Sequence, residues 1–277
     1  MKIVVGTDGS ENATAAMRWA AEEAEINGAD LEVMLVWSYL DQFHPDRSDT
    51  FDAAYTEDAA RAALASWVSE ELGPGVAVEQ HVVNDLPANA LLEAGDAADL
   101  LVLGGRGRGG FPGLLLGSVS ERVAQLASRP VAVVRAAAPV RGGRVVVGID
   151  RSARSTSALR WAAAEAKARG AELDVVHAWR MPTLSATPSG PVLPEYPVVE
   201  QAGRAVLDAA LHDPALADLK VRPHFTADRP ARALIELGAG AGLLVVGTRG
   251  LGRVAGTLLG SVSRQLLHHA PCPVVVI

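Results

Sequence analysis

Residues 100–118 read LLVLGGRGRGGFPGLLLGS, an apolar run followed by glycines at positions 104, 107 and 117 and then by Ser118. The apolar run predicts a buried strand, and the amphipathic segment that begins at Ser118 predicts a helix. Glycines let the main chain approach a ligand and adopt positive φ, and a helix N-terminus supplies unpaired N–H groups and a partial positive charge. This arrangement predicts a cradle for an anion such as a nucleotide phosphate.

The same spacing recurs in the second half of the chain at Gly247, Gly250 and Gly260, again after an apolar run. The stretch VVGTDGS at 4–10 likewise resembles VVGIDRS at 146–152. A repeat of this length is far too long for a solenoid, so each copy should be a complete domain. The sequence therefore predicts two phosphate cradles, one in each half.

The repeat predicts domains at 1–138 and 144–277, joined by a stretch of small residues and proline at 136–143. Strands and helices alternate along each copy, and the strands are short, unbroken and apolar, as expected for a parallel sheet covered on both faces. The predicted fold class is α/β, with two tandem doubly wound domains, each a five-stranded parallel sheet with helices on both faces. In the first copy we expect strands at 3–7, 31–37, 76–83, 100–104 and 131–135, and helices at 12–27, 57–72, 87–95 and 118–128.

Composition and charge exclude several classes of protein. The chain has 277 residues, of which 49% are hydrophobic and 21% charged, as in globular proteins. A formal net charge of −7 argues against nucleic-acid binding, and no window of about 18 uncharged apolar residues predicts a membrane span. The first residues lead directly into a strand and leave no room for a signal peptide, so we expect a cytoplasmic protein. A single cysteine, Cys272, excludes an internal disulfide and any multi-cysteine metal site.

An aspartate follows the first strand of each copy, Asp8 in one and Asp150 in the other. In open α/β sheets a ligand binds beyond the carboxyl ends of the strands, where the strand order reverses. If the first and fourth strands are neighbours, each aspartate faces its glycine loop, where it would accept hydrogen bonds from a base or ribose or help to hold a metal. The alternative is that each aspartate caps the following helix, and both roles are compatible.

Serines begin the helix that follows each glycine loop. Ser118 and Glu121 have the spacing of a capping box, but Arg264 takes the position of Glu121 in the second copy. Because the second copy loses the glutamate and keeps both serines, we predict that the serine hydroxyls donate hydrogen bonds to phosphate. The four serines are Ser118, Ser120, Ser261 and Ser263.

No pattern in the chain indicates a catalytic centre. There is no Gly-Lys-Ser or Gly-Lys-Thr of a P-loop, no paired histidines of a zinc enzyme, and no nucleophile elbow. The second copy contains a proline-rich insert at 182–197, which fits either a lid over a ligand or an ordinary surface loop.

These residues resemble the universal stress protein family in its tandem two-domain form. The family signature, G-x-x-G, nine residues and G-[S/T], is matched at 104–118 and at 247–261. The resemblance implies a strand order 3-2-1-4-5 and one ATP site per domain, with Mg²⁺ or Mn²⁺ as the accompanying metal. It implies a first site formed by Gly6, Thr7, Asp8, Val36, Leu103, Gly104, Gly107, Gly117, Ser118, Val119 and Ser120. The second would comprise Gly148, Ile149, Asp150, Ala178, Val246, Gly247, Gly250, Gly260, Ser261, Val262 and Ser263.

The resemblance implies an ATP-binding regulator of the stress response that acts through an unidentified protein partner. With no general base in the motif, we expect little or no hydrolysis and no classical enzyme activity. Two alternatives remain: an ATP-using transferase or hydrolase with an unrecognised acceptor site, and a scaffold that has lost nucleotide binding. We also expect the final strands, 131–135 and 274–277, to pair within the chain as an internal pseudo-dimer, with a homodimer as a further possibility.

Overall fold

The computed structural model describes residues 1–37, 56–73, 76–108, 115–135, 143–181, 185–187, 190–192, 195–250 and 259–277. The chain divides into two compact units. One contains Met1–Pro139 with Pro273–Val275, and the other contains Val140–Cys272 with Val276–Ile277. Most of the expected joint, residues 136–142, lies outside the described residues.

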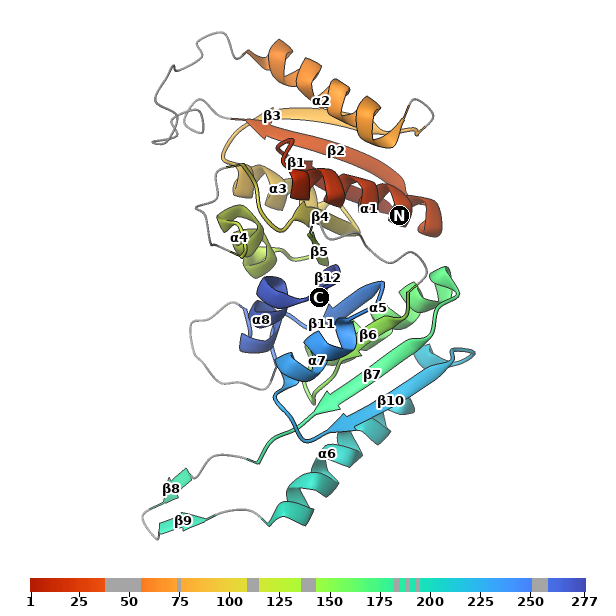
Figure 1. Ribbon diagram of the computed structural model, residues 1–277, viewed down its shortest axis with the longest axis vertical. Helices are drawn as coiled ribbons and strands as arrows, with labels where there is room; N and C mark the ends of the chain where they lie inside the picture. The colour runs from red at the N-terminus through yellow and green to blue at the C-terminus, as the bar shows by residue number, and fades with distance from the viewer. Residues whose placement is uncertain are drawn as a thin grey trace. The chain divides into compact units, whose positions relative to one another are not determined.

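The first unit is built on a five-stranded parallel sheet (Figure 1). Its strands lie in the order β3-β2-β1-β4-β5, which confirms the order that the resemblance implies. They are β1 (Lys2–Thr7), β2 (Asp30–Trp37), β3 (Glu79–Asn84), β4 (Leu100–Gly104) and β5 (Val131–Val134). Because β1 pairs with β4, the two strands that carry the aspartate and the glycine loop end side by side.

Four helices cover the two faces of this sheet. They are α1 (Glu11–Asn27), α2 (Glu57–Leu72), α3 (Pro87–Asp96) and α4 (Ser118–Leu126). Helix α1 contacts α2, and α3 contacts α4, so the helices form one pair on each face (Figure 1). Helix α1 buries Ala13, Met17 and Ala20 on one stripe and ends at Gly28, whose φ of 59° is left-handed.

The second unit repeats this plan. Parallel strands β6 (Val145–Gly148), β7 (Leu173–Ala178), β10 (Val221–Thr226) and β11 (Leu243–Val246) lie in the order β10-β7-β6-β11. Beyond β12 (Val274–Val276), the N–H of Ile277 donates to the Val246 oxygen at 2.9 Å, and the Thr248 N–H donates to the Ile277 oxygen at 2.8 Å. The helices are α5 (Ala153–Arg169), α6 (Tyr196–Leu211), α7 (Pro230–Gly238) and α8 (Ser261–His269), with a 3₁₀ turn, η2, at Pro214–Leu216.

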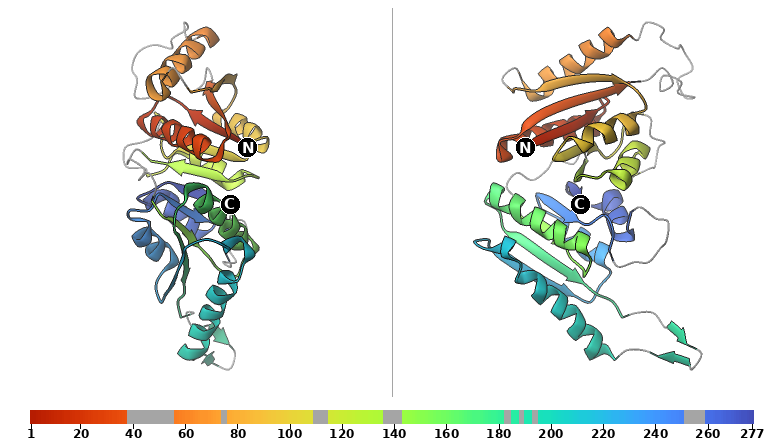
Figure 2. Two further views of the ribbon diagram at one scale, coloured as in Figure 1. Left: turned by 90° about the vertical axis from the view of Figure 1, so that its right-hand side faces the viewer. Right: turned by 180° about the vertical axis from the view of Figure 1, so that it is seen from behind.

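The proline-rich insert contains a short antiparallel hairpin, β8 (Ser185–Thr187) with β9 (Gly190–Val192) (Figure 2). Pro197, expected within the insert, instead lies in the first turn of α6, where a missing N–H removes no helical hydrogen bond. Much of the insert lies outside the described residues, so the choice between a lid and a surface loop stays open.

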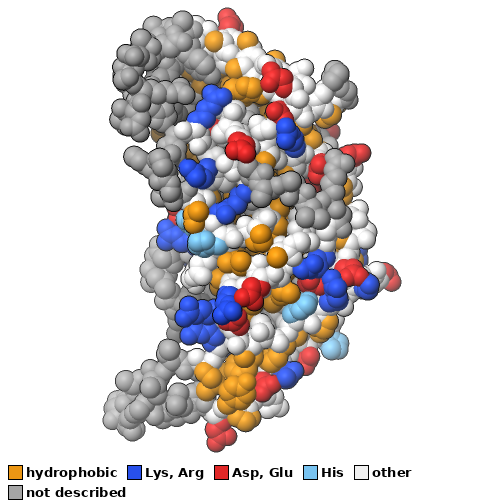
Figure 3. Space-filling model, viewed as in Figure 1, with side chains coloured by type: hydrophobic (Ala, Val, Ile, Leu, Met, Phe, Trp, Pro, Cys, Tyr) orange, Lys and Arg blue, Asp and Glu red, His pale blue; other side chains and the backbone are white. Residues whose placement is uncertain are grey.

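The described surface carries charges of both signs. On the face in Figure 3, lysine and arginine side chains alternate with aspartate and glutamate rather than gathering into one basic stripe. None of the described helices is both long enough and apolar enough to cross a bilayer.

Cys272 is buried, and this burial raises the pKa of its thiol to about 12. A raised pKa favours the protonated thiol, so the reactive thiolate is scarce at neutral pH. We expect Ellman's reagent at pH 8 to modify Cys272 in the folded protein roughly a thousandfold more slowly than in urea. The time course of colour formation measures both rates, and equal rates would contradict the burial of this side chain.

Candidate functional site

Each aspartate lies against the glycine loop of its own unit. In the first unit, the Asp8 carboxylate accepts the Ser10 N–H at 3.0 Å and the Arg108 N–H at 2.8 Å. A Cβ atom built on Gly107 would collide with Asp8 Oδ2, which places this glycine directly on the carboxylate. In the second unit Gly250 lies in the same way on Asp150. Aspartate and loop therefore meet at the carboxyl ends of two adjacent strands.

The helices after these aspartates are capped by serines, not by the aspartates. Ser10 is the N-cap of α1, and its hydroxyl oxygen accepts the Ala13 N–H at 3.3 Å. Ser152 caps α5 and accepts the Ser155 N–H at 3.2 Å. The capping alternative for the aspartates is wrong, because each carboxylate instead binds the N–H of the capping serine.

The first glycine of each motif makes room for a helix. A Cβ atom on Gly104 would lie 2.7 Å from the main-chain nitrogen of Ala13, and one on Gly247 would lie 2.9 Å from Cβ of Arg154. None of the motif glycines is among the described residues with positive φ. The expectation of left-handed glycines is therefore wrong, and close packing of α1 and α5 explains Gly104 and Gly247.

The second helix of the site begins without a side-chain cap. Gly117 is the N-cap of α4 and Gly260 that of α8, and neither helix has a side-chain hydrogen bond at its cap. The capping-box spacing of Ser118 and Glu121 does not form a capping box here, because Ser118 is already the first helical residue. The first N–H groups of each helix have no acceptor within the helix, which is the feature that binds anions.

Two of the four serine hydroxyls are used within the protein. Ser120 donates to the Gly104 oxygen at 2.7 Å, and Ser263 donates to the Gly247 oxygen at 2.9 Å. These buried serines fix the helix start to the strand end, so their predicted role as hydroxyl donors to phosphate is not supported. Ser118 and Ser261 are exposed residues at the helix start.

A pocket with a volume of about 250 Å³ opens at this edge of the second sheet. All eleven residues predicted for the second site line it. They are Gly148, Ile149, Asp150, Ala178, Val246, Gly247, Gly250, Gly260, Ser261, Val262 and Ser263. The residues that the resemblance implies for the second site are far apart along the chain, and the fold brings them into one cavity.

Further residues line the pocket that the sequence did not single out for the site. They are Ser155, Val176, Pro230 and Leu234. Arg249, which lies inside the predicted cradle, lines the pocket as well. The Ser155 hydroxyl donates to the main-chain carbonyl oxygen of Asp150 at 2.7 Å and so fixes the turn that carries the aspartate. Pro230 and Leu234 come from α7. The sequence signal that could have identified these two residues is their spacing of four, because it puts them on one face of the helix.

The first-site residues occupy the equivalent places in the first unit. Gly6, Thr7 and Asp8 lie at the end of β1, Val36 near the end of β2, and Leu103 and Gly104 at the end of β4. Gly107 lies on Asp8, while Gly117, Ser118, Val119 and Ser120 form the start of α4. Gly6 leaves space for Leu91 and Leu103, whose side chains would lie 2.8 and 2.9 Å from a Cβ atom.

This duplicated site agrees with what the chain resembles. The sequence model of the universal stress protein family matches residues 1–135 and again residues 143–277. The chain belongs to the universal stress protein family. It is 34% identical to a universal stress protein of Mycobacterium tuberculosis, over 99% of this chain and 96% of that protein. It is 32% identical to one from Mycolicibacterium smegmatis, over 99% and 96%.

A solved structure of a universal stress protein from Archaeoglobus fulgidus has the same fold. It superposes with a TM-score of 0.71 at 22% identity, covering 99% of this chain and 97% of the other. The tandem arrangement of this universal stress protein is therefore shared by relatives of nearly the same extent.

Proposed function

We propose that this universal stress protein binds ATP at both duplicated sites and acts as a nucleotide-dependent regulator. The observation that supports the proposal most strongly is the pocket of the second unit, lined by every residue predicted for that site. Its composition suits a nucleotide. Val176, Ala178, Pro230 and Leu234 offer apolar contact to a base, whereas Asp150 offers a carboxylate to a ribose or base.

The phosphates would lie at the start of α8. There the N–H groups of Ser261, Val262 and Ser263 lack acceptors within the helix, and the helix dipole favours negative charge. Arg249, also on the pocket wall, adds a positive charge. In the first unit the start of α4, with Ser118, is proposed to have the same role.

A divalent cation fits this arrangement as a companion of the phosphates. Asp150 is the only carboxylate among the described residues of the pocket wall. Mg²⁺ is commonly held by one or two carboxylates together with phosphate oxygens, so Asp150 would supply the protein ligand. We therefore propose that ATP binds with Mg²⁺ or Mn²⁺.

The residues around the pocket favour binding over turnover. Hydrolysis needs a group that activates or orients the attacking water, and the described pocket wall contains no histidine, lysine or glutamate. Binding of ATP would then act by changing how the protein binds a protein partner. A transferase with an acceptor site elsewhere remains the alternative, and steady phosphate release at roughly 10 per second would favour it.

Calorimetric titration with ATP and Mg²⁺ tests the proposal. We expect two sites per chain, and one site in each of the variants Gly117→Ala and Gly260→Ala, because the added methyl group stands at the helix start where the phosphates bind. A Cβ atom on Gly117 would come no closer than 3.5 Å to described protein atoms, so this variant should fold normally. A folded protein that binds no ATP would refute the proposal, and two sites in both variants would refute the phosphate position.

A further inference from the structure

A second groove, with a volume of about 290 Å³, lies between α5 and α6 in the second unit. Its apolar residues include Leu159 from α5 and Val206, Ala209 and Ala210 from α6, and polar residues such as Thr156 and Asp213 line the rest of its wall. Arg151, in the turn before α5, lies at its edge. The groove borders the nucleotide pocket along that turn, because both are lined by Ile149, Asp150 and Ser155.

The first unit fills the corresponding space with large side chains. Helices α2 and α6 both have 16 residues, and alignment of their ends places buried Val68 of α2 on buried Leu207 of α6. In this alignment Trp67 of α2 corresponds to Val206 of α6, and Glu71 corresponds to Ala210. At these two positions α6 thus has smaller, uncharged side chains than α2.

In the first unit Trp67 occupies the space that corresponds to the groove of the second unit. The Trp67 ring lies directly on Gly9, where an added Cβ atom would collide with it, and the Arg108 guanidinium lies 5.1 Å from the ring centroid. Glu71 forms an ion pair with Arg18 of α1 across the same helix pair. In the second unit Arg151 takes the position of Gly9. Arg160, the equivalent of Arg18, forms an ion pair with Asp213, which lies beyond the end of α6.

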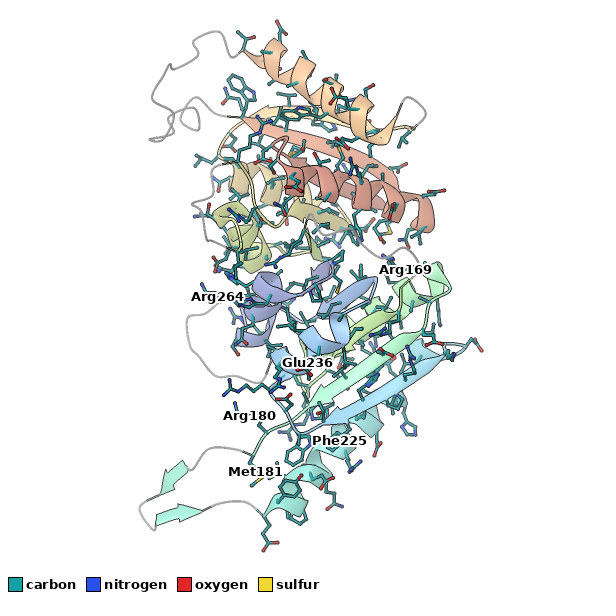
Figure 4. The ribbon with its side chains drawn as sticks, viewed as in Figure 1. Arg169, Arg180, Met181, Phe225, Glu236 and Arg264 are labelled. Carbon is teal, nitrogen blue, oxygen red and sulfur yellow. The ribbon has the colours of Figure 1, made fainter. Side chains whose placement is uncertain are left out.

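Helix α6 is held firmly on its other side, so the groove does not reflect a loosely packed helix. Gly203 allows Phe225 of β10 to approach, since a Cβ atom there would lie 3.0 Å from the Phe225 ring (Figure 4). Arg204 lies over the same ring at 4.6 Å, and Trp179 stacks on it at a centroid distance of 6.0 Å. Helix α6 is therefore packed against the sheet around Phe225.

The charges at the groove favour an anion. Arg151 is exposed, and within the described parts of the chain it has no ion pair. Two acidic residues line the groove wall, Asp150 and Asp213. Asp213 binds the Arg160 guanidinium and the Ala215 N–H at 3.0 and 2.9 Å. The Asp150 carboxylate accepts the Ser152 N–H at 2.8 Å and lies against Gly250 of the glycine loop. Arg151 therefore faces a partly apolar groove whose two carboxylates are bound to other groups, an arrangement that suits an apolar ring that carries an acidic group.

We propose that the α5–α6 groove binds a small aromatic anion, a ligand site present in the second domain and filled by Trp67 in the first. This site is separate from the proposed ATP sites and does not depend on them. Its position beside the turn of Asp150 would let the bound anion contact the wall that the two cavities share.

Binding of the aromatic sulfonate 8-anilinonaphthalene-1-sulfonate tests the proposal. We expect one saturable site per chain by fluorescence and calorimetry. Val206→Trp, which restores the side chain of the first domain, should weaken binding at least tenfold by filling the groove. Arg151→Gln should weaken it by roughly fivefold to tenfold through loss of the charged hydrogen bond. The uncharged probe N-phenyl-1-naphthylamine should bind wild type and Arg151→Gln equally.

Two controls keep the result decisive. Gln201→Trp adds the same ring at an exposed position of α6 that does not line the groove, and should leave binding unchanged. Circular dichroism must show that every variant is folded. Saturable binding that survives Val206→Trp, or that is displaced by ATP alone, would place the probe elsewhere and overturn the proposal, as would absence of saturable binding to the wild type.

Discussion

Gly104→Ala is expected to lower the free energy of unfolding of the first unit by about 1–3 kcal/mol. The new methyl group would lie 2.7 Å from both the Ala13 nitrogen and the Asn12 carbonyl carbon. These are main-chain atoms in the first turn of α1, so relief requires the helix to move away from β4 rather than a side chain to rotate. Urea unfolding, followed by circular dichroism, measures the loss.

Gly117→Ala is the matched control within the same motif. Gly117 has φ −78° and ψ 150°, which alanine adopts easily, and its nearest described neighbours would be 3.5 Å away. Alanine should be neutral there, or slightly stabilising, because it reduces the freedom of the unfolded chain. Equal stability of the two variants would contradict the conclusion that Gly104 is required by helix packing.

The arrangement of the strands could be predicted because buried parallel strands leave unbroken apolar runs. The strand at 100–104 and the helix at 57–72 were predicted with the bounds that the structure has. The strand predicted at 76–83 begins later, at Glu79, and ends at Asn84. This strand lies at the sheet edge and its side chains are mostly exposed, so it has no apolar run of its own. The apolar residues 76–78, which precede the strand, therefore placed its predicted start too early.

The members of the second site could also be predicted, but not what each of them contacts. The repeated spacing identified Gly247 and Ser263, and both line the pocket. Spacing carries no information about which neighbour needs the space or accepts the hydrogen bond. Thus Gly247 proved to accommodate α5, and the Ser263 hydroxyl proved to bind the Gly247 oxygen.

The groove beside α6 could not be predicted either, because the sequence does not show which side chains meet in the fold. It depends on Val206 standing where α2 has Trp67, and on Arg151 standing where the first copy has Gly9. The two helices differ in most of their residues, so only their positions in the folded units show which side chains correspond.

Gly250→Ala is expected to weaken ATP binding at the second site roughly tenfold to a hundredfold and to leave the first site intact, so that titration resolves one site of wild-type affinity and one weak site. The added methyl group would collide with Asp150 Oδ2, so either the carboxylate or the glycine loop must move. Both belong to the wall of the same pocket. A strain of about 1–3 kcal/mol spread over these groups corresponds to a loss of affinity of roughly tenfold to a hundredfold.

The first unit supplies the reciprocal variant, because Gly107 lies on Asp8 as Gly250 lies on Asp150. Gly107→Ala should weaken the first site alone by a similar factor, and the double variant should bind ATP weakly at both sites while keeping the circular dichroism spectrum of the wild type. Asp150→Asn separates the two causes of loss, since it keeps the shape of the side chain and removes its charge. If Gly250→Ala weakens ATP while Asp150→Asn does not, the glycine acts through the position of the loop rather than through the carboxylate. Retention of two sites with unchanged affinity in Gly250→Ala would show that ATP does not bind at the contact between aspartate and glycine loop.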